Sequence, residues 1–280
     1  MIKEIIKDLK THFVLLGALI LFFIFLLLRL LDLNFFANVR QASFDYYQDF
    51  FPISYEESPV VIVAIDEKSL EKYGQFPWPR TYLASLVDKI GKAGAIIISI
   101  DILLPEEDRT SLDKIANQYQ LDKEKFKDFY FQLSNDQLLS NVFRQHNVVM
   151  GISPAYNIQE KVKPLKQRVR YTVEKKGNIN TSSYFHYPKS IHSLNILEQN
   201  ARGIGNLGYI PEKDGVVRKT PMMIKIEQTM WPSLELEMIR TALNQKKYYL
   251  TEKYMQGHFV STGNYSIPTD QQSQKWIYYK

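Results

Sequence analysis

Two aspartates, each at the end of an apolar run, are the residues of this chain whose type and spacing best suit chemistry. Asp66 follows Val60–Ile65, and Asp101 follows Ala95–Ile100. Two carboxylates that meet at one edge of a sheet can act as an acid–base pair or hold a divalent cation through oxygen ligands. An aspartate at a strand end also serves as a cap that accepts backbone N–H bonds. A structural, a ligand-contact and a catalytic role therefore all remain open for this pair.

Three further features can contact a ligand or hold the fold. Trp78 lies between two prolines, which stiffen the backbone, so its indole either offers a face to a ligand or closes the end of a core. Arg80 can neutralise one of the two aspartates. Arg218 follows a turn at Asp214 and can reach a carboxylate across a hairpin or bind an anion through two hydrogen bonds. We predict ligand-contact or structural roles, and no catalytic role, for Asp66, Trp78, Arg80, Asp101, Asp214 and Arg218.

The spacing of the histidines and glycines and the absence of cysteine argue against a metal or cofactor. The five histidines show none of the spacings of a zinc site, and the absence of cysteine excludes thiolate ligands and disulfides. Gly203 and Gly205 lack the helix and the third glycine of a phosphate-binding loop, so we assign them to strand geometry. We predict no metal and no cofactor.

The elements that must position these residues indicate an α/β domain. The runs before Asp66 and Asp101 are continuous and rich in β-branched residues, which is typical of strands buried on both faces. Pro79 opens a helix between them that ends near Gly94. Strand, helix and strand in this order predict a parallel βαβ unit with a right-handed crossover. Both aspartates would then lie at one sheet edge, where ligands of open α/β sheets bind.

The later segments extend this pattern. Ser134–Gln137 resembles a capping box that starts a helix, and Val148–Ile152 indicates a third parallel strand. Asp214–Gly215 is a strong turn signal and predicts a β-hairpin from the residues on either side. A helix from about Trp231 to Asn244 and a strand-like tail follow. We therefore predict an α/β fold with a mixed, largely parallel central sheet, flanking helices and an antiparallel hairpin edge.

The N-terminal region contains one long apolar run, Phe13–Leu31, whose single charge is Arg29 near its end. At about 1.5 Å per residue, a helix of this length nearly matches a hydrocarbon core of roughly 30 Å. Three lysines precede the run, so the positive-inside rule predicts a cytoplasmic N-terminus. A cleaved signal peptide is the alternative, although the run is longer than a usual h-region and no A-x-A site follows. Residues 34–52 indicate an amphipathic helix next to the membrane.

Composition supports a folded domain and argues against a nucleic-acid partner. The chain is 45% hydrophobic and 23% charged, which is an ordinary globular balance. Much of the net charge of +5 comes from residues 160–176, which carry few aromatic residues and no helical phasing. We predict a solvated loop or edge hairpin there, and no nucleic-acid partner. Anionic lipid or cell-wall polymer is the functional alternative for this segment.

These motifs, in this order, resemble the second class of CHASE domain, an extracellular sensory domain of bacterial cyclases, histidine kinases and serine/threonine kinases. The resemblance covers roughly residues 44–280. In that family, further transmembrane helices and a cytoplasmic catalytic domain follow the sensory domain, and this sequence contains neither. The resemblance therefore implies a receptor truncated before its output domain. It rests on Val60–Asp66 with Ser69, Leu70 and Gly74, on Phe76–Arg80, on Gly94–Ala95 with Ile100–Asp101, on Gly205–Asn206, and on Asp214–Arg218 with Pro221.

Together, the apolar run and the resemblance predict four parts: a cytoplasmic flank (1–12), a transmembrane helix (13–31), a juxtamembrane helix (34–52) and a CHASE-like sensory domain (53–280) with an incomplete C-terminal end. The chain would be a single-pass protein of the inner membrane with its main domain outside the cytoplasm.

The resemblance also implies a function. The domain would bind an unknown small molecule or envelope ligand, possess no catalytic activity of its own, form a homodimer, and control a cyclase or kinase. A standalone membrane-anchored binding or adhesion module is the alternative, and an envelope hydrolase that uses Asp66 and Asp101 is a third hypothesis. Continuation of the reading frame past Lys280 separates the first two.

Overall fold

The structure is a computed structural model that describes residues 2–30, 34–52, 58–122, 124–125, 127–128, 133–157, 169–253 and 256–279. The chain divides into two compact units. The first comprises Met1–Val61 and Tyr278–Lys280, and the second comprises Ile62–Ile277. All the described strands and all the predicted site residues belong to the second unit.

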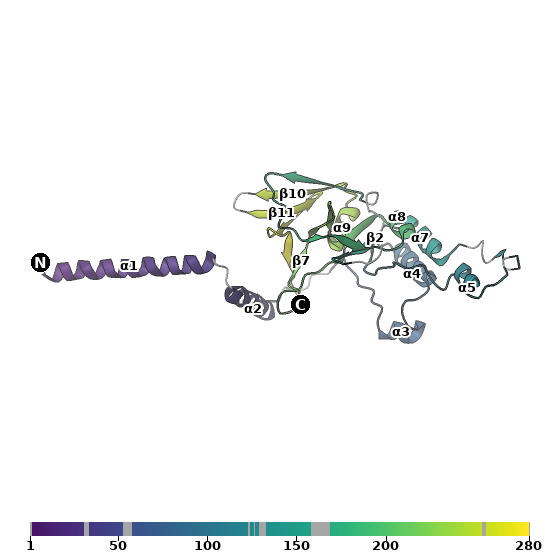
Figure 1. Ribbon diagram of the computed structural model, residues 1–280, viewed down its shortest axis with the longest axis horizontal. Helices are drawn as coiled ribbons and strands as arrows, with labels where there is room; N and C mark the ends of the chain where they lie inside the picture. The colour runs from purple at the N-terminus through teal and green to yellow at the C-terminus, as the bar shows by residue number, and fades with distance from the viewer. Residues whose placement is uncertain are drawn as a thin grey trace. The chain divides into compact units, whose positions relative to one another are not determined.

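The first unit contains two helices, α1 (Ile2–Leu30) and α2 (Asn34–Phe50), both labelled in Figure 1. α2 falls within the predicted helix 34–52. The Phe44 ring of α2 lies 5.7 Å from that of Tyr278, and Gln48 Oε1 accepts a hydrogen bond from Tyr279 N at 2.7 Å. Tyr278 and Tyr279, near the end of the sequence, therefore pack against α2, the second helix of the chain.

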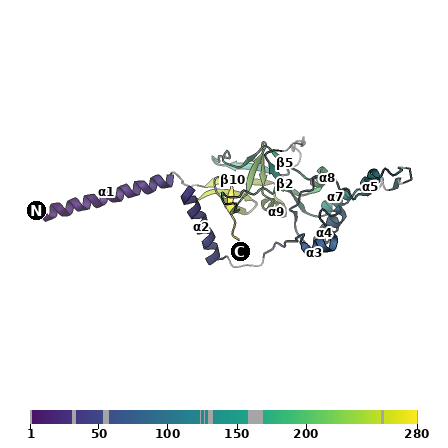
Figure 2. The ribbon, with the colours of Figure 1, turned by 60° about the horizontal axis from the view of Figure 1, so that its bottom comes forward.

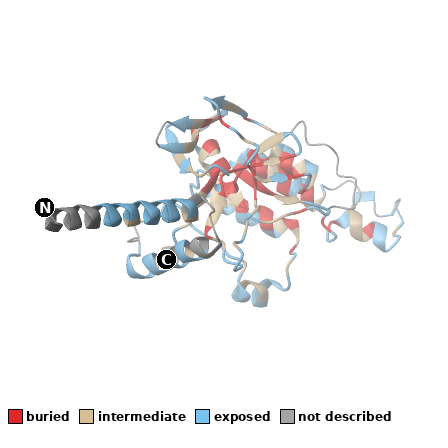
Figure 3. Cartoon of the chain, turned by 60° about the vertical axis from the view of Figure 1, so that its left-hand side comes forward, coloured by how far each residue is buried: buried red, intermediate tan, exposed pale blue. Residues whose placement is uncertain are grey.

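Residues 13–30 of the apolar run lie in α1, and most of its described side chains are solvent-exposed, as the pale blue helix in Figure 3 shows. Over the part of the chain that the structure describes, no helix combines the length and the apolar character needed to cross a membrane. The transmembrane helix 13–31 thus stays a prediction.

The central sheet of the second unit is mixed and largely parallel, as the sequence predicts. Its strands are β1 (Ile98–Ile100), β2 (Val148–Ala155), β5 (Lys189–Ile191) and β6 (Gly203–Asn206). β2 runs parallel to β1 and to β6, whereas β5 pairs antiparallel with the far end of β2. Residues 148–152 of β2 are fully enclosed, which explains their unbroken apolar sequence.

Three helices cover one part of this sheet: α4 (Arg80–Lys92), α7 (Asn135–Gln145) and α8 (Asn195–Asn200), which lie together in Figure 1. The predicted capping box of Ser134 and Gln137 starts α7. The apolar stripes of α4 and α7 then face the strands, because residues three and four apart share one face of a helix. Their core, red in Figure 3, includes Leu83, Val87, Ile98, Ile100, Leu139, Phe143, Met150 and Leu197.

The helix α9 (Leu234–Ala242) packs against β6, and glycine permits this approach. A Cβ at Gly205 would lie 2.5 Å from the Cα of Leu234, closer than real side chains come. The strand assignment of Gly203 and Gly205 is therefore confirmed, and close packing is its physical reason. α9 begins after Ser233, later than predicted, because Trp231 and Pro232 belong to a strand.

The remaining strands form further sheets, which Figure 2 shows beside the central one. One has the order β12 (Tyr265–Thr269), β11 (Gly257–Thr262), β10 (Lys247–Lys253) and β3 (Thr172–Lys176). Another has the order β4 (His186–Tyr187), β8 (Met223–Ile226) and β9 (Thr229–Pro232), and β7 (Lys219–Pro221) pairs with β13 (Gln274–Trp276). Part of the basic segment thus forms β3, parallel to β10, whereas residues 158–168 lie outside the described residues.

The prediction of a first strand before Asp66 is wrong. Residues 60–66 form no strand in this structure, and Val61 and Ile62 are 84% and 87% exposed. At Asp66 the chain turns directly into the short helix α3 (Glu67–Tyr73), which has no buried residue. Of the predicted βαβ unit, only the helix α4 and the second strand, β1, are therefore present. A strand depends on a neighbour elsewhere in the chain, which its own apolar sequence cannot specify.

The predicted hairpin around Asp214–Gly215 is also wrong in its pairing. The turn itself exists: Gly215 has φ +83° and its N–H donates to Glu212 O at 2.9 Å. However, the strands on either side pair elsewhere, β6 with β2, β7 with β13 and β8 with β9. Antiparallel pairs occur instead at β8–β9 and along β10–β11–β12. A turn sequence fixes a local reversal, whereas distant edges decide the partners.

Candidate functional site

Asp66 is a helix cap. Its Oδ1 accepts hydrogen bonds from Ser69 N at 2.9 Å and from Ser69 Oγ at 2.6 Å, which starts α3. These hydrogen bonds hold the pKa of the Asp66 carboxyl below its ordinary value. The geometry supports the structural role for this residue.

Asp101 lies beyond the end of β1 and is solvent-exposed. Partial loss of surrounding water, and then the charge of Glu235, raise the pKa of its carboxyl. Because residues 60–66 do not join the sheet, no common sheet edge brings Asp66 to Asp101. The prediction that both aspartates lie at one sheet edge is therefore wrong, and the acid–base pair, the shared cation site and the hydrolase hypothesis lose the geometry on which they were based.

Trp78 closes a local aromatic cluster. Its side chain is 8% exposed and its Nε1–H donates to Gly74 O at 2.6 Å. The Tyr73 and Phe76 rings lie edge-on at 5.6 and 6.0 Å. The indole thus fills a small core, and the structure favours that interpretation over a face presented to a ligand.

Arg218 pairs with Asp214, four residues before it. Its Nη2 lies 2.8 Å from Asp214 Oδ2, and its Nη1 donates to Oδ1 at 3.0 Å. The hydrogen bonds from Arg218 come first among the causes that lower the pKa of Asp214. Arg218 therefore braces the turn, and it reaches neither Asp66 nor Asp101.

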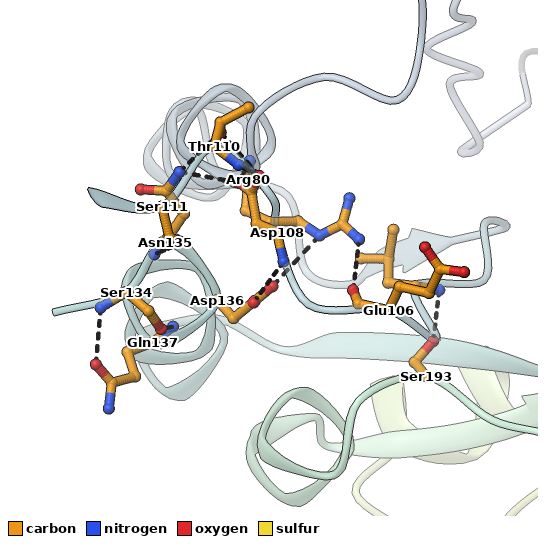
Figure 4. Close-up of polar contacts among 11 residues, drawn as sticks. Arg80, Glu106, Asp108, Thr110, Ser111, Ser134, Asn135, Asp136, Gln137 and Ser193 are labelled. Carbon is orange, nitrogen blue, oxygen red and sulfur yellow. Dashed lines mark hydrogen bonds and ion pairs between the residues drawn. The ribbon is translucent and has the colours of Figure 1, made fainter. Parts of the chain in front are cut away.

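Arg80, in contrast, lies at the centre of a buried polar network, drawn in Figure 4. It is the first residue of α4, where the Pro79 cap offers no side-chain acceptor. The N–H of Arg80 instead donates to Asp108 Oδ2 at 2.7 Å. Its side chain is 7% exposed, and the guanidinium donates through Nη2 to Glu106 O at 3.2 Å and has its Nε 3.4 Å from Asp136 Oδ1. Arg80 thus pairs with Asp136, and not with Asp66 or Asp101.

Asp108 is the acceptor that organises this network. Besides Arg80 N, it accepts hydrogen bonds from Thr110 N and Thr110 Oγ1 at 2.8 Å each, and from Asn135 Nδ2 at 2.9 Å. Burial alone would raise the pKa of this carboxyl, but the hydrogen bonds from Arg80 and Thr110 outweigh it and lower the pKa. Asp108 therefore stays ionised and caps α4 from a distant loop.

Asp136, in the first turn of α7, belongs to the same network but leaves one of its two carboxylate oxygens without a hydrogen bond. Its Oδ2 accepts a hydrogen bond from Asp108 N at 2.8 Å, whereas its buried Oδ1 has no hydrogen-bond partner. Only 5% of the residue is exposed. Burial raises the pKa of this carboxyl, and the Asp108 N–H and the charge of Arg80 only partly offset it. The Oδ1 atom of Asp136 is thus a buried acceptor without a hydrogen-bond partner, and it belongs to a carboxyl whose ionised form is disfavoured by burial.

A pocket of about 540 Å³ opens beside Asp136. It lies where the starts of α7 and α8 meet α5 (Leu112–Gln118) and the loop before α5. Asp113 also has a buried Oδ1 without a hydrogen-bond partner. Lys114 supplies a positive charge but already pairs with Glu107. The lining residues are Glu107, Asp113, Lys114, Ser134, Asp136, Gln137, Leu194, Asn195 and Ile196.

Sequence reasoning found one residue of this site, Arg80, and missed Asp108 and Asp136. The capping box located the start of α7 and so could have drawn attention to Asp136, which lies inside the motif. Asp108 has a local partner in Thr110, but Arg80 and Asp136, the partners that place it in the network, lie 28 residues away in opposite directions along the chain.

A second buried cluster has the order of a catalytic triad. Ser190 Oγ lies 2.8 Å from His192 Nε2, and His192 Nδ1 lies 3.0 Å from Glu198 Oε1. Glu198 also accepts a hydrogen bond from Ser193 N at 2.9 Å. A nucleophile must meet its substrate, yet Ser190 is 2% exposed. The cluster instead links β5 to α8.

Metal ligands do not gather in the described ranges: no group of three or more His, Cys, Asp or Glu side chains there is placed to hold an ion.

The fold and site together define an α/β domain with a polar pocket braced by buried charges. A comparison with protein families matches residues 17–280 to the CHASE2 domain. The chain therefore belongs to the CHASE2 domain family, an extracellular, non-catalytic sensory domain of signalling receptors. Neither a curated protein nor a solved structure matches the chain.

Proposed function

We propose that this chain is the extracytoplasmic sensor of a bacterial membrane receptor and that the pocket beside Asp136 holds its ligand. The observation that carries the proposal is the buried Oδ1 of Asp136, an acceptor without a hydrogen-bond partner at the wall of a pocket. Buried acceptors normally have partners, so a ligand donor is its natural complement. The proposal agrees with the sensory role of the family.

The charges around the pocket indicate the class of ligand. Among the described residues that line it, Glu107, Asp113 and Asp136 are acidic and Lys114 is the one cation, and Asp113 adds a second buried acceptor. A small polar molecule with a protonated amine would supply hydrogen-bond donors and the missing positive charge. Ser134, Gln137 and Asn195 offer further polar contacts that can orient it.

The site can also transmit binding. Asp136 belongs to α7, Asp108 to the preceding loop and Arg80 to α4. A ligand that binds Asp136 therefore changes the contacts at the starts of α4 and α7. A signal requires that the ligand bind one of two arrangements more tightly than the other. A downstream cyclase or kinase is the proposed output, and reading the native transcript beyond codon 280 separates a receptor from an anchored binding module.

The proposed anchor is α1. The run Phe13–Leu31 supports it, since nearly every residue is apolar and the described side chains from Phe13 to Leu27 lie against solvent. In α1 the side chains are described only from residue 12 to 28, so the end of the run, residues 29–31, lies outside them. Membrane attachment, the homodimer and the lack of a nucleic-acid partner all remain predictions.

The test measures thermal unfolding of the full chain in lipid nanodiscs with two probes. Putrescine, a diamine, should raise the unfolding midpoint, whereas succinate, a dicarboxylate, should not. Asp136→Asn should weaken putrescine binding by about tenfold or more, because one charge-assisted hydrogen bond is lost. Glu252→Gln, on the exposed end of β10, is the matched control and should bind as the unchanged chain does.

Binding of succinate in place of putrescine would overturn the ligand class. Equal putrescine binding by the unchanged chain and by Asp136→Asn would remove the pocket from the proposal, even if the receptor role persists.

A further inference from the structure

The sheet of β3, β10, β11 and β12 has one face that points away from the core. On its other face, Tyr248, Leu250 and Val260 are buried together. Successive side chains of a strand point to opposite faces, so the residues at the alternate positions share the outward side, where they are exposed or half-buried. This outer face includes Glu174 and Lys176 of β3, Lys247, Tyr249 and Lys253 of β10, and Phe259 of β11.

Two aromatic rings lie on the outer face, and a lysine lies over each of them. Lys176 Nζ is 4.0 Å from the centroid of the Tyr249 ring. Lys253 Nζ is 4.8 Å from the centroid of the Phe259 ring. β10 and β11 pair antiparallel, with Tyr249 opposite Ser261, two residues from Phe259. The two ring–lysine pairs are therefore diagonal neighbours on adjacent strands, with their aromatic residues about 7–8 Å apart.

The outer face has an excess of positive charge. Lys247 pairs with Glu174 at 2.5 Å, and both of these side chains are about half exposed. Lys176 and Lys253 lie over rings instead, and no ion pair joins either of them to a carboxylate of the described residues. A lysine over a solvent-exposed ring is held weakly, so an anion can draw the ammonium group aside and uncover the ring. Each ring–lysine pair therefore offers a positive charge and an apolar surface to the same partner.

The aromatic residues of the outer face come from outside the basic segment. Residues 160–176 carry few aromatic residues, which argued against a nucleic-acid surface there. In the structure the end of this segment forms β3, and the rings come from β10 and β11, much later in the chain. Strand pairing thus supplies the rings that the segment itself lacks.

We propose that the outer face binds an anionic polysaccharide, a linear polymer of sugars that carry carboxylates. Each sugar of such a polymer combines an anion for a lysine with an apolar C–H face for an aromatic ring. The two ring–lysine pairs can engage two positions of one polymer chain, and linked contacts bind more tightly than either contact alone. The family is extracellular, which places such polymers within reach. The outer face shares no residue with the pocket beside Asp136 and does not depend on the ligand there.

The test measures binding of the full chain, in nanodiscs of phosphatidylcholine, to immobilised polygalacturonate, a linear polymer of a sugar carboxylate. Methyl-esterified polygalacturonate has the same sugar without the charge, and poly-L-glutamate has the charge without the sugar. Each of these should bind at least tenfold more weakly than polygalacturonate. Binding of polygalacturonate should also weaken as the salt concentration rises, because salt screens exposed charges.

Two double variants test whether the ring–lysine pairs make the contact. Lys176→Gln with Lys253→Gln removes both charges. Tyr249→Leu with Phe259→Leu removes both rings and keeps apolar side chains at these positions. Each double variant should weaken the binding of polygalacturonate by tenfold or more. Thermal unfolding checks that each variant folds, and the lysine variant decides the result if the aromatic one does not, because exposed substitutions seldom affect folding.

The matched controls remove the same groups from exposed positions outside this sheet. They are Lys68→Gln with Lys89→Gln, and Tyr119→Leu with Tyr209→Leu, and each should change binding by less than twofold. The proposal is overturned if polygalacturonate does not bind, if poly-L-glutamate binds equally well, or if the variants and their controls lose binding equally. Tighter binding of single-stranded DNA, or of vesicles rich in phosphatidylglycerol, would assign the outer face to another class of partner and would overturn it as well.

Discussion

At the residue scale, Arg80 holds two carboxylates in a buried network. Arg80→Ala removes the guanidinium beside Asp136 and leaves that carboxyl buried beside Asp108 without the cation that pairs with it. We expect a loss of about 3 kcal/mol or more in the free energy of unfolding, measured by urea denaturation, because breaking a buried ion pair strands a charge. Arg109→Ala, at an exposed neighbouring position, should change it by less than about 0.5 kcal/mol. Equal effects of the two substitutions would contradict the network.

The two aspartates of the network should respond oppositely to pH. Folding raises the pKa of Asp136 above its ordinary value of 3.8, so the folded chain binds more protons there and loses stability as the pH rises above that value. Folding lowers the pKa of Asp108, so that residue adds stability as the pH rises toward 3.8. Asp136→Asn removes only the first effect.

The stability of Asp136→Asn relative to the unchanged chain should therefore increase between about pH 3 and pH 7. Urea unfolding at about pH 3, 5 and 7 measures it. A difference that stays constant with pH would mean that Asp136 titrates as an ordinary carboxyl. Asp122→Asn, at an exposed position, is the control for the removal of a surface charge.

At the element scale, α7 depends on its capping box. Ser134 Oγ accepts from Gln137 N at 3.2 Å, and Gln137 Oε1 accepts from Ser134 N at 2.8 Å. Ser134→Ala should lower the free energy of unfolding by about 1 kcal/mol, because one helix N–H loses its acceptor. Ser134→Thr should retain most of it. Ser85→Ala, on the exposed face of α4, should leave stability within about 0.5 kcal/mol, and a cost equal to that of Ser134→Ala would contradict the cap.

At the scale of the whole molecule, the proposed anchor predicts a topology. Alkaline phosphatase fused to the C-terminal end of the chain should be active in a bacterial envelope, and green fluorescent protein at that position should be dark. Green fluorescent protein before residue 1 should fluoresce. Replacing Ile20 and Ile24 with Lys should abolish phosphatase activity, because each charge costs about 3 kcal/mol at the centre of a membrane helix. An active phosphatase at the N-terminus would reverse the predicted orientation.

Interactions between near neighbours were predictable from the sequence. The capping box at Ser134 and the turn at Gly215 rest on contacts that span a few residues, and the position of Pro79 predicted the start of α4 through the backbone geometry of proline. The strands at β1 and β2 were also predictable, since their apolar, β-branched runs suit a covered sheet. The CHASE2 family followed from the order of the same motifs.

Partnerships between distant segments required the tertiary structure. The sequence showed that Arg80, Asp66 and Arg218 carry charge, but it could not show that Arg80 meets Asp136 and Asp108, or that Asp66 and Arg218 find partners within four residues.

By itself, then, the sequence determined the local elements, the apolar run of α1 and the family. The tertiary structure alone decided which strand edges are paired, that Val60–Val63 are exposed, and that Asp136 borders a pocket. The physical reason is that hydrogen bonds within a turn depend on the residues of that turn, whereas sheet pairing and charge burial depend on which distant groups reach the same place.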